Sequence, residues 1–331
     1  MPVRLLSLIR VLVPLALLAA LFFFVDIGNG WRLLADASPG PVLAALLIVQ
    51  LQTVLAAVRW RMTANSLGQK LALSRAISEY YGASLLNLTL PGGISGDVVR
   101  VIRNREGVDG GASWERPAQA VLLERASGQV VFAAVAAAGM MLWTFEPASG
   151  LPDAAREKLR LLALVATSLL VAAGGVMLFA RELVPGFVLR FGKSAFLVVQ
   201  RPRDAVLQIA LSLAVVAAHL AVFALASRAI GAPIDVKQSL LLVPPVLLTM
   251  ILPVSVGGWG VREVAAAAMW PLAGFSPAEG VAASVLYGLV STAGALPGLF
   301  AFGSALSLRL PWHRSPLHGS APPVVDEERR A

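Results

Sequence analysis

The stretch Leu90–Arg100, which reads LPGGISGDVVR, lies at the end of an apolar segment and interrupts it with a proline and three glycines. A related stretch, Leu252–Arg262 (LPVSVGGWGVR), ends a second apolar segment and aligns with the first without a gap. The two share their leucine, their proline, one glycine, a valine and the final arginine. Glycine- and proline-interrupted segments at corresponding positions of two halves are typical of duplicated transporters, where they mark the substrate site. We therefore interpret the chain as a duplicated membrane protein.

The composition is that of an integral membrane protein. The chain has 331 residues, of which 57% are hydrophobic and 14% are charged, and its mean hydropathy is +0.77. Several uncharged stretches reach or approach the roughly 20 residues that a helix needs to cross the hydrocarbon core. Because the sequence has no cysteine and three histidines, it predicts no disulfide, no metal site and no cofactor.

The formal net charge of +8 indicates an anionic partner. The basic residues flank apolar spans and lack interleaved aromatic residues, so an anionic lipid surface is favoured and no nucleic acid is expected. We predict a multi-pass protein of the cell (inner or cytoplasmic) membrane.

The N-terminus combines Arg4 and Arg10 with an apolar run that extends to Val25, as a secretory signal does. Ala35-Asp36-Ala37 could serve as its cleavage site. The run is longer than the roughly 7 to 15 residues of a signal peptide, and the Ala-x-Ala tripeptide lies well beyond its end. We therefore expect a first membrane helix instead of a cleaved signal.

Apolar spans are predicted at about 5–25, 41–58, 76–96, 117–145, 160–180, 205–227, 238–256, 263–275 and 279–307. Lysine and arginine concentrate in cytoplasmic loops, which places both termini in the cytoplasm. Cytoplasmic charges after the second span are Arg59, Arg61, Lys70 and Arg75.

Segment 76–96 poses a contradiction for a simple crossing. A full crossing would carry Arg100, Arg103 and Arg105 to the outside. We therefore predict a re-entrant hairpin, whose arm of about 11 helical residues at 1.5 Å each reaches roughly half of a 30 Å core. By the same reasoning, 238–256 and 263–275 form a second hairpin that enters from outside.

The predicted fold class is an all-α membrane protein, a polytopic helical bundle of about six crossings plus two re-entrant helical hairpins. Each half has three crossings and one hairpin, and an odd number of crossings gives the halves opposite orientations, which is an inverted-topology repeat. The alternative is eight or nine plain crossings joined by ordinary loops. The predicted units are a first repeat over 1–145 with its hairpin near 76–105, a second over 146–310 with its hairpin near 238–275, and a disordered cytoplasmic tail over 311–331.

The glycines of the two tips are candidate substrate-binding positions. A helix break at membrane depth leaves backbone N–H and C=O groups unpaired, which is tolerated only inside protein or in a wet cavity. Glycine allows close backbone approach, and a helix that starts at the tip points its positive dipole end at an anion such as a lipid phosphate. The alternative role is close helix packing. These glycines are Gly92, Gly93, Gly96, Gly257, Gly258 and Gly260.

Both motifs end in an arginine with an acidic neighbour. Asp97 lies three residues before Arg100, and Glu263 directly follows Arg262. A guanidinium fork fits phosphate well, although Arg100 could also be a positive-inside charge at the hairpin exit. Arg262 follows a run without charges from Gln238 to Val261, and a charge buried in a membrane is functional by default.

Glu124 and Arg125 lie about two turns inside the 117–145 span, where a charge costs roughly 2.5 to 3.5 kcal/mol on insertion scales. Adjacent helix positions diverge by about 100°, so the two side chains face different partners. The alternative is snorkelling to the cytoplasmic interface. The predicted partners are Arg100 or Arg262 for Glu124, and Asp97 or Glu263 for Arg125.

His219 is the histidine that falls within a predicted span. It could relay protons at ordinary pH. The alternative is a packing histidine held by hydrogen bonds.

These residues resemble the lysylphosphatidylglycerol synthase transmembrane region, a family also described as flippase-like. The family pattern is an Asn-Leu-x-Leu-Pro-Gly loop running into Gly-Asp and Arg, an intramembrane Glu-Arg, and a late Pro-x-x-x-Gly-Gly-x-Gly-Val-Arg-Glu. It is similar to Asn87–Arg100, Glu124-Arg125 and Pro253–Glu263 here, so the resemblance covers most of the membrane region.

The resemblance implies translocation of lipid between leaflets, of aminoacylated phosphatidylglycerol in the multiple peptide resistance factor and of polyisoprenoid- or hopanoid-linked lipids elsewhere. The chain is expected to lack the aminoacyltransferase domain of the full synthase. We therefore predict a translocase of an anionic or phosphate-linked lipid, either a phospholipid or a polyisoprenoid-phosphate lipid, and no enzymatic activity.

Two other classes stay open. One is a non-transporting scaffold or accessory subunit that assembles with lipid- or glycan-synthesis enzymes. The other is a rhomboid-like intramembrane serine protease, because Gly93–Gly96 matches a Gly-x-Ser-Gly turn and His219 could act as its base. Against the protease, Gly257 replaces Ser95 in the second motif, as expected if the turn matters and the hydroxyl does not.

Overall fold

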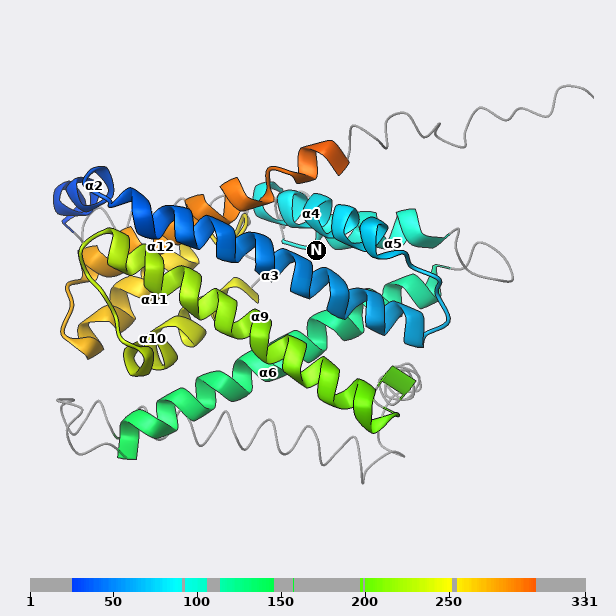
Figure 1. The fold of residues 1–331 in the computed structure, drawn as a ribbon. Coiled ribbons are helices and arrows are strands. Elements are labelled where there is room, and N and C mark those ends of the chain that lie inside the picture. Colours follow the sequence, from blue (N-terminus) through cyan, green and yellow to red (C-terminus); the bar gives the residue numbers. More distant parts are fainter. Residues whose placement is uncertain are drawn as a thin grey trace, which may run out of the picture.

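The computed structural model describes residues 26–90, 93–105, 114–145, 157, 197–198, 200–251 and 255–301. Every regular element in these residues is a helix, so the predicted all-α class is confirmed (Figure 1). The helices are α2 (Ile27–Ala35), α3 (Pro39–Ser66), α4 (Leu73–Thr89), α5 (Ser95–Asn104), α6 (Glu115–Phe145), α9 (Pro202–Ala229), α10 (Val236–Leu248), α11 (Val261–Met269) and α12 (Pro277–Ala295), with the 3-10 turns η3 (Thr249–Ile251) and η4 (Trp270–Ala273).

Four helices in this part of the chain are long and apolar enough to cross a membrane: α3, α6, α9, and α12 with its continuation to Ala301. They fall on the predicted spans at 41–58, 117–145, 205–227 and 279–307. The chain is therefore a helical membrane protein. The predicted spans at 5–25 and 160–180 and the tail at 311–331 lie outside the described residues, and the total of six crossings stays a prediction.

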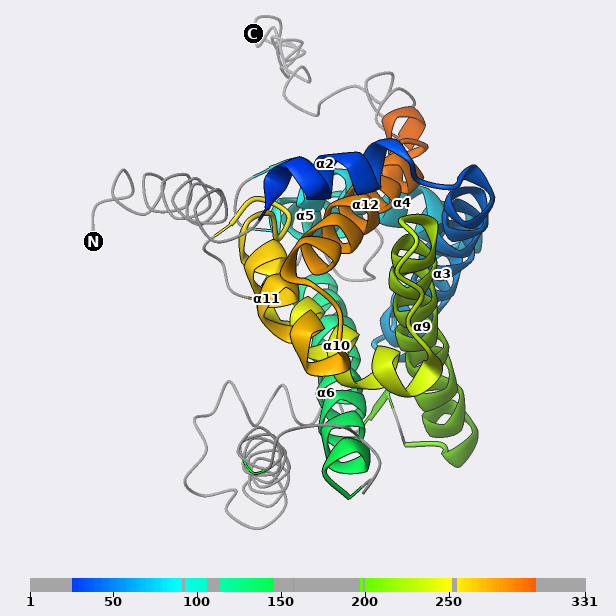
Figure 2. The same ribbon diagram turned by 90° about the vertical axis from the view of Figure 1, so that its left-hand side faces the viewer.

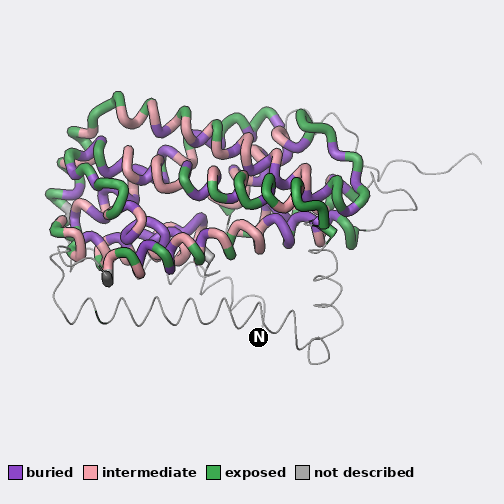
Figure 3. The backbone as a smooth tube through the Cα atoms, turned by 60° about the horizontal axis from the view of Figure 1, so that its bottom comes forward, coloured by how far each residue is buried: buried purple, intermediate pink, exposed green. Residues whose placement is uncertain are grey.

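The crossing helices pack around two clusters of buried apolar residues, the larger of which contains Phe223, Trp270 and Tyr287. α3 runs along α9, and α12 contacts both of them (Figures 1 and 2). The ring of Phe223 lies 5.2 Å from that of Trp270 and 5.0 Å from that of Tyr287 between ring centroids. Buried residues follow the inner faces of the helices and exposed ones the outer faces (Figure 3). The outer faces carry large apolar side chains such as Leu47 and Val206, which suits contact with lipid.

The first motif forms the turn between α4 and α5. Leu90 has extended backbone angles, φ −102° and ψ 149°, which is the conformation that a following proline favours. The helix therefore ends before Pro91 and starts again at Ser95. The loop includes Gly93, whose φ is +63°.

The two arms of this first hairpin lie side by side along their length. A Cβ built on Gly96 of α5 would lie 2.1 Å from the carbonyl oxygen of Ala83 on α4, so the backbones approach more closely than any other residue allows. At the open end, Arg103 Nε lies 2.9 Å from Glu79 Oε1. The chain thus reverses direction between α4 and α5.

The second motif lies between α10 and α11. α10 begins with a capping box in which Asp235 and Gln238 satisfy each other's backbone N–H groups, and it continues into η3. Within the predicted apolar segment 263–275, α11 gives way after Met269 to η4, because Pro271 lacks the N–H that would continue an α-helix.

Candidate functional site

The tips of the two hairpins meet at Gly257 and Leu88. A Cβ built on Gly257 would lie 2.5 Å from the carbonyl oxygen of Leu88, and the φ of Gly257 is +56°. Only glycine meets both demands, the close approach and the positive φ. The structure therefore places the second stretch against the last turn of α4, directly before the first stretch begins.

A cavity of about 480 Å³ lies where the tips meet. Its volume is in the range of roughly 300 to 1,000 Å³ that is typical of ligand sites. Both tips contribute to its wall, together with α3, α4, α6, α9 and α12. Its charged lining is Arg59, Glu124, Arg125 and Arg262. Its apolar lining includes Val49, Phe132, Val215, Val216, Leu247 and Met250.

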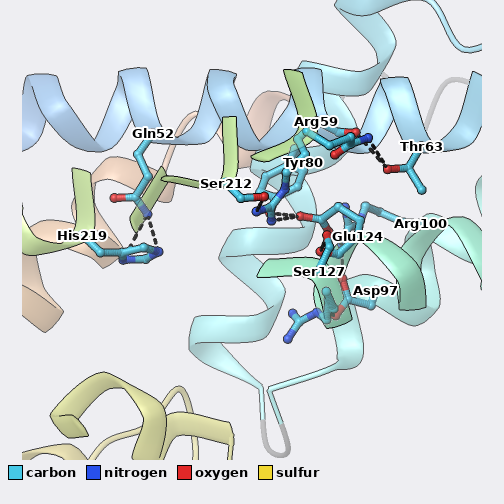
Figure 4. A network of polar contacts seen from close by, with 12 residues as sticks. Gln52, Arg59, Thr63, Tyr80, Asp97, Arg100, Glu124, Ser127, Ser212 and His219 are labelled. Atoms are coloured by element: carbon cyan, nitrogen blue, oxygen red, sulfur yellow. Dashed lines mark hydrogen bonds and ion pairs between the residues drawn. The ribbon is translucent and has the colours of Figure 1, made fainter. Parts of the chain in front are cut away.

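A cluster of five charged side chains, the first charged cluster, joins α3, α5 and α6 (Figure 4). Glu124 is central, with Arg59 Nη2 at 2.5 Å from its Oε1 and Arg100 Nη2 at 3.7 Å from its Oε2. Asp97 pairs with both Arg100 and Arg125. The side chain of Arg125 is 39% exposed, whereas those of Arg59, Arg100 and Glu124 are at most 5% exposed. The cluster has one positive charge in excess, and Arg125 is its accessible cation.

Arg100 is held between two aromatic rings. Its guanidinium carbon lies 4.8 Å from the ring centroid of Trp60 and 4.7 Å from that of Tyr80. Its Nε and Nη1 atoms are buried and have no hydrogen-bond partner among the described residues. Attraction to the ring faces compensates part of that loss. Arg100 does not line the cavity and instead positions Asp97 and Glu124, which do contact the cavity-lining arginines.

Arg59 is a site residue that sequence reasoning missed. Its charge was expected in the cytoplasm after the second span, but the residue is 4% exposed and binds Glu124 and Ser212. α3 continues to Ser66, about two turns beyond Arg59, so this arginine lies inside the bundle. The length of the helix could have indicated that Arg59 is buried, but the positive-inside rule favoured a cytoplasmic position for it.

A second charged cluster surrounds Arg262. Arg262 Nη2 lies 2.7 Å from Glu263 Oε1, and its Nε donates to Ser284 Oγ at 2.9 Å. The Ser284 hydroxyl donates in turn to Glu263 Oε1 at 2.9 Å. The guanidinium carbon lies 5.0 Å from the ring of Trp259 and 5.2 Å from that of Tyr287. Arg262 thus resembles Arg100 in its surroundings, yet it lines the cavity.

The predicted pairs within the first cluster, Glu124 with Arg100 and Arg125 with Asp97, are both present. The alternative pairs that linked Glu124 to Arg262 and Arg125 to Glu263 are not among the ion pairs of the described residues. Each motif therefore forms its own cluster.

One N–H group at the start of each helix that follows a tip has a side-chain acceptor from the protein. Gly96 N donates to Asn87 Oδ1 at 2.8 Å, and Gly260 N donates to Glu263 Oε2 at 2.6 Å. These bonds satisfy donors that were expected to face an anion. The charged donors in the cavity wall are the guanidinium groups of Arg59, Arg125 and Arg262.

His219 lies in the cavity wall and joins two neighbours. Its Nδ1 is 2.8 Å from the Tyr287 hydroxyl, and its Nε2 is 3.1 Å from Gln52 Nε2. The rings of His219 and Phe132 pack in a T-shaped arrangement, with 5.7 Å between their centroids. Ser95 shares no hydrogen bond with His219 in the described part of the chain, so the geometry does not support a Ser-His dyad. A role in proton relay stays a prediction.

The structure separates the candidate residues into three groups, and Gly92 lies outside the described residues. Those that line the cavity are Gly93, Glu124, Arg125, His219, Gly257, Gly258 and Arg262. Those that contact lining residues from behind are Asp97, Arg100 and Glu263. Those that serve packing or capping are Gly96 and Gly260. Within the same residues, no group of three or more histidine or acidic side chains is placed to hold a metal ion.

A membrane bundle with a charged cavity between two helical hairpins defines the class of protein. The family model for the lysylphosphatidylglycerol synthase TM region matches residues 8–298. The chain belongs to this family, which is a membrane family linked to lipid modification or translocation. No curated protein matches the chain.

Proposed function

We propose that the protein moves a lipid with an anionic, phosphate-bearing head group between the two leaflets of the cell membrane, and that it is a facilitator and not an enzyme. The head group occupies the cavity while its tails stay in the bilayer. One observation carries this proposal, namely that a cavity within a membrane bundle is lined by three arginines and one glutamate.

The charges in the cavity wall favour an anion. Glu124 binds Arg59 directly, which leaves Arg125 and Arg262 as the cations nearest to an entering ligand. Their acidic partners, Asp97 and Glu263, do not line the cavity. A phosphate accepts paired hydrogen bonds from guanidinium groups, and charges are retained inside membranes chiefly where function needs them.

The apolar part of the cavity suits the lipid tails. Phe132, Leu247 and Met250 contribute apolar wall. Ile94 lines the cavity and is also 55% exposed, so apolar surface continues from the cavity to the outside of the bundle beside the first tip. A tail could follow this surface without leaving an apolar environment.

We further propose that both hairpins are re-entrant and belong to an inverted repeat, with both termini in the cytoplasm. α5 has 10 residues and α11 has 9. At 1.5 Å per residue each is about 15 Å long, half of a roughly 30 Å core. Arms of this length support hairpins that enter and leave on one side, with a cavity near the midplane. The arm α4 is longer than the predicted arm of about 11 residues, because it has 17 residues and a length of about 25 Å.

A vesicle assay tests the proposed function. Purified protein is reconstituted in phosphatidylcholine vesicles that carry phosphatidylglycerol with a fluorescent acyl chain, and the fraction accessible to an external quencher is followed in time. We expect the protein to accelerate movement between leaflets, and Arg125→Gln and Arg262→Gln to remove most of the acceleration. Arg228→Gln, an exposed arginine in the last turn of α9, is the matched control.

Wild-type rates equal to those of empty vesicles would overturn the proposal. In that case, co-purification of the protein with a lipid- or glycan-synthesis enzyme would support the scaffold function instead. Equal losses in Arg228→Gln and Arg262→Gln would show that the assay reports net charge and not the cavity.

A further inference from the structure

His219 has neighbours in the cavity wall that suit both of its protonation states. Its Nδ1 lies 2.8 Å from the Tyr287 hydroxyl, and its Nε2 lies 3.1 Å from Gln52 Nε2. In this arrangement the Gln52 amide donates to Nε2, so the ring is neutral and its Nδ1–H donates to the tyrosine. A half-turn of the amide would present its oxygen to Nε2 instead, and both ring nitrogens could then donate. The same three side chains therefore satisfy the neutral and the protonated imidazole.

The charges around His219 make its protonation depend on what the cavity holds. The titratable and charged side chains that share its cavity wall are Arg59 of α3, Tyr80 of α4, Glu124 and Arg125 of α6, Arg262 of α11 and Tyr287 of α12. The first charged cluster has one positive charge in excess, whereas Arg262 is matched by Glu263. A further proton is therefore unfavourable in the empty cavity and becomes more favourable once an anion has entered.

We propose that His219 binds one proton for each anionic head group that enters the cavity, so that lipid and proton are moved together. This inference rests on the proposed function and names its energy source, a proton gradient. Nε2 takes the proton from water on one side of the membrane and releases it to water on the other side, as the head group leaves. One anion and one proton together add no charge to the cavity. The loaded and the empty protein therefore carry the same charge, and a membrane potential favours neither.

The first experiment uses the phosphatidylcholine vesicles that carry labelled phosphatidylglycerol, now with a pH difference across the membrane and the external quencher as the readout. With about pH 6 inside and about pH 8 outside, one proton per lipid sets a limit of about 100-fold enrichment in the outer leaflet, because each pH unit is a tenfold ratio. We expect the wild-type protein to enrich the label there. His219→Gln should let the label even out, and empty vesicles give the background.

A potassium diffusion potential, set with valinomycin at equal pH, is the complementary driving force. It should leave the wild-type distribution of the label unchanged, because lipid and proton together carry no charge. In His219→Gln the anion would move without a proton, so the label should accumulate on the positive side. The wild type and the variant thus respond to opposite driving forces, which a histidine that only fills space would not produce.

A second pair of variants keeps His219 and changes its neighbour. At equal pH on both sides, the wild-type rate should fall as pH rises, since less His219 is protonated. Gln52→Glu places a carboxylate beside Nε2, which favours the imidazolium, so the pH of half-maximal rate should rise by roughly 1 to 3 units. Gln52→Met removes the acceptor and should lower it. Tyr81→Phe is the matched control, because its hydroxyl bonds to Gln50 at 2.6 Å away from the cavity wall, and nothing should shift.

Two outcomes overturn the inference in distinguishable ways. If the wild type moves the label faster than empty vesicles do, yet distributes it evenly under the pH difference, no proton travels with the lipid and the proposed function stands alone. If the wild type is no faster than empty vesicles, the proposed function fails and the inference falls with it. Should His219→Gln not fold, an unchanged half-maximal pH in both Gln52 variants overturns the inference.

Discussion

Arg100 and Arg262, the arginines that end the two motifs, have nearly identical local surroundings. They are 2% and 0% exposed. Each guanidinium lies within 5.2 Å of one tryptophan ring and one tyrosine ring, and each pairs with an acid close in sequence. Their neighbours across the bundle differ. Arg100 meets Glu124 of α6 and is cut off from the cavity, whereas Arg262 meets Ser284 of α12 and faces it.

The comparison separates what a motif determines from what the packing of distant helices determines. The local motif sets the ion pair and places the arginine after the turn. The partner helix decides whether the guanidinium reaches the ligand. In the first half, Arg125 of α6 lines the cavity, and Arg100 lies outside the cavity wall and contacts Asp97, the ion-pair partner of Arg125. The two halves thus reach similar cavity walls with differently placed arginines.

The largest effect is expected from Glu124→Gln, which disrupts the first charged cluster and leaves the second charged cluster unchanged. Glu124 is the only carboxylate in contact with Arg59 among the described residues, and it also pairs with Arg100. Removing one partner from a buried ion pair typically costs about 3 to 5 kcal/mol because the other charge stays buried. We expect the free energy of unfolding, determined from detergent-induced unfolding curves, to fall by this amount. Glu115→Gln, at the exposed start of the same helix, should change it little.

A smaller effect is expected where the halves touch, from Gly257→Ala. The new Cβ would meet the Leu88 carbonyl at 2.5 Å and would force a positive φ on alanine. The strain of φ should cost roughly 1 to 2 kcal/mol and the overpacking about 1 to 3 more. Gly274→Ala supplies the control, because Gly274 has φ +83° and nothing within 4 Å of its Cβ position. Equal losses in both variants would mean that the tips do not press on each other.

The membrane class, the two motifs and the pairs Glu124–Arg100 and Arg125–Asp97 could be predicted from the sequence, because a charge among apolar residues needs a partner of opposite sign. The burial of Arg59 could not, since its partner lies on a helix far along the chain. The capping role of Glu263 could not be predicted from the sequence either. Its second oxygen accepts from Gly260 N, a bond that depends on the backbone angles of the turn.

A third prediction sharpens the contrast between the two arginines directly. Arg100→Lys keeps the charge but loses the planar guanidinium, whose Nη2 contacts both Asp97 and Glu124 and whose face lies against the rings of Trp60 and Tyr80. Stability should therefore fall by about 2 kcal/mol, the value of one charged hydrogen bond. Arg262→Lys should lose more transport per folded molecule than Arg100→Lys does, because Arg262 lines the cavity. Unfolding midpoints and vesicle transport rates measured on both variants check this. The reverse order of transport losses would show that Arg100, and not Arg262, meets the ligand.

The smallest effect is expected at the open end of the first hairpin, where Glu79 is 5% exposed and lies between two arginines. Arg103 contacts it at 2.9 Å with a side chain 25% exposed, whereas Arg75 lies 4.0 Å away and is 50% exposed. Ion pairs whose cation is partly exposed contribute roughly 0 to 1 kcal/mol, so Arg103→Gln should lower stability by about 1 kcal/mol. Arg75→Gln should cost a similar amount, because Arg75 Nη2 also donates to the Arg103 backbone oxygen at 2.6 Å between the two arms. The same unfolding assay measures both, at low and at high salt.

The α10–α11 hairpin has no ion pair between its arms in the described residues, so its stability rests on apolar contacts. Salt should therefore weaken the first hairpin and leave the second unchanged, and an equal response of the two variants to salt would contradict a specific clamp at Arg103.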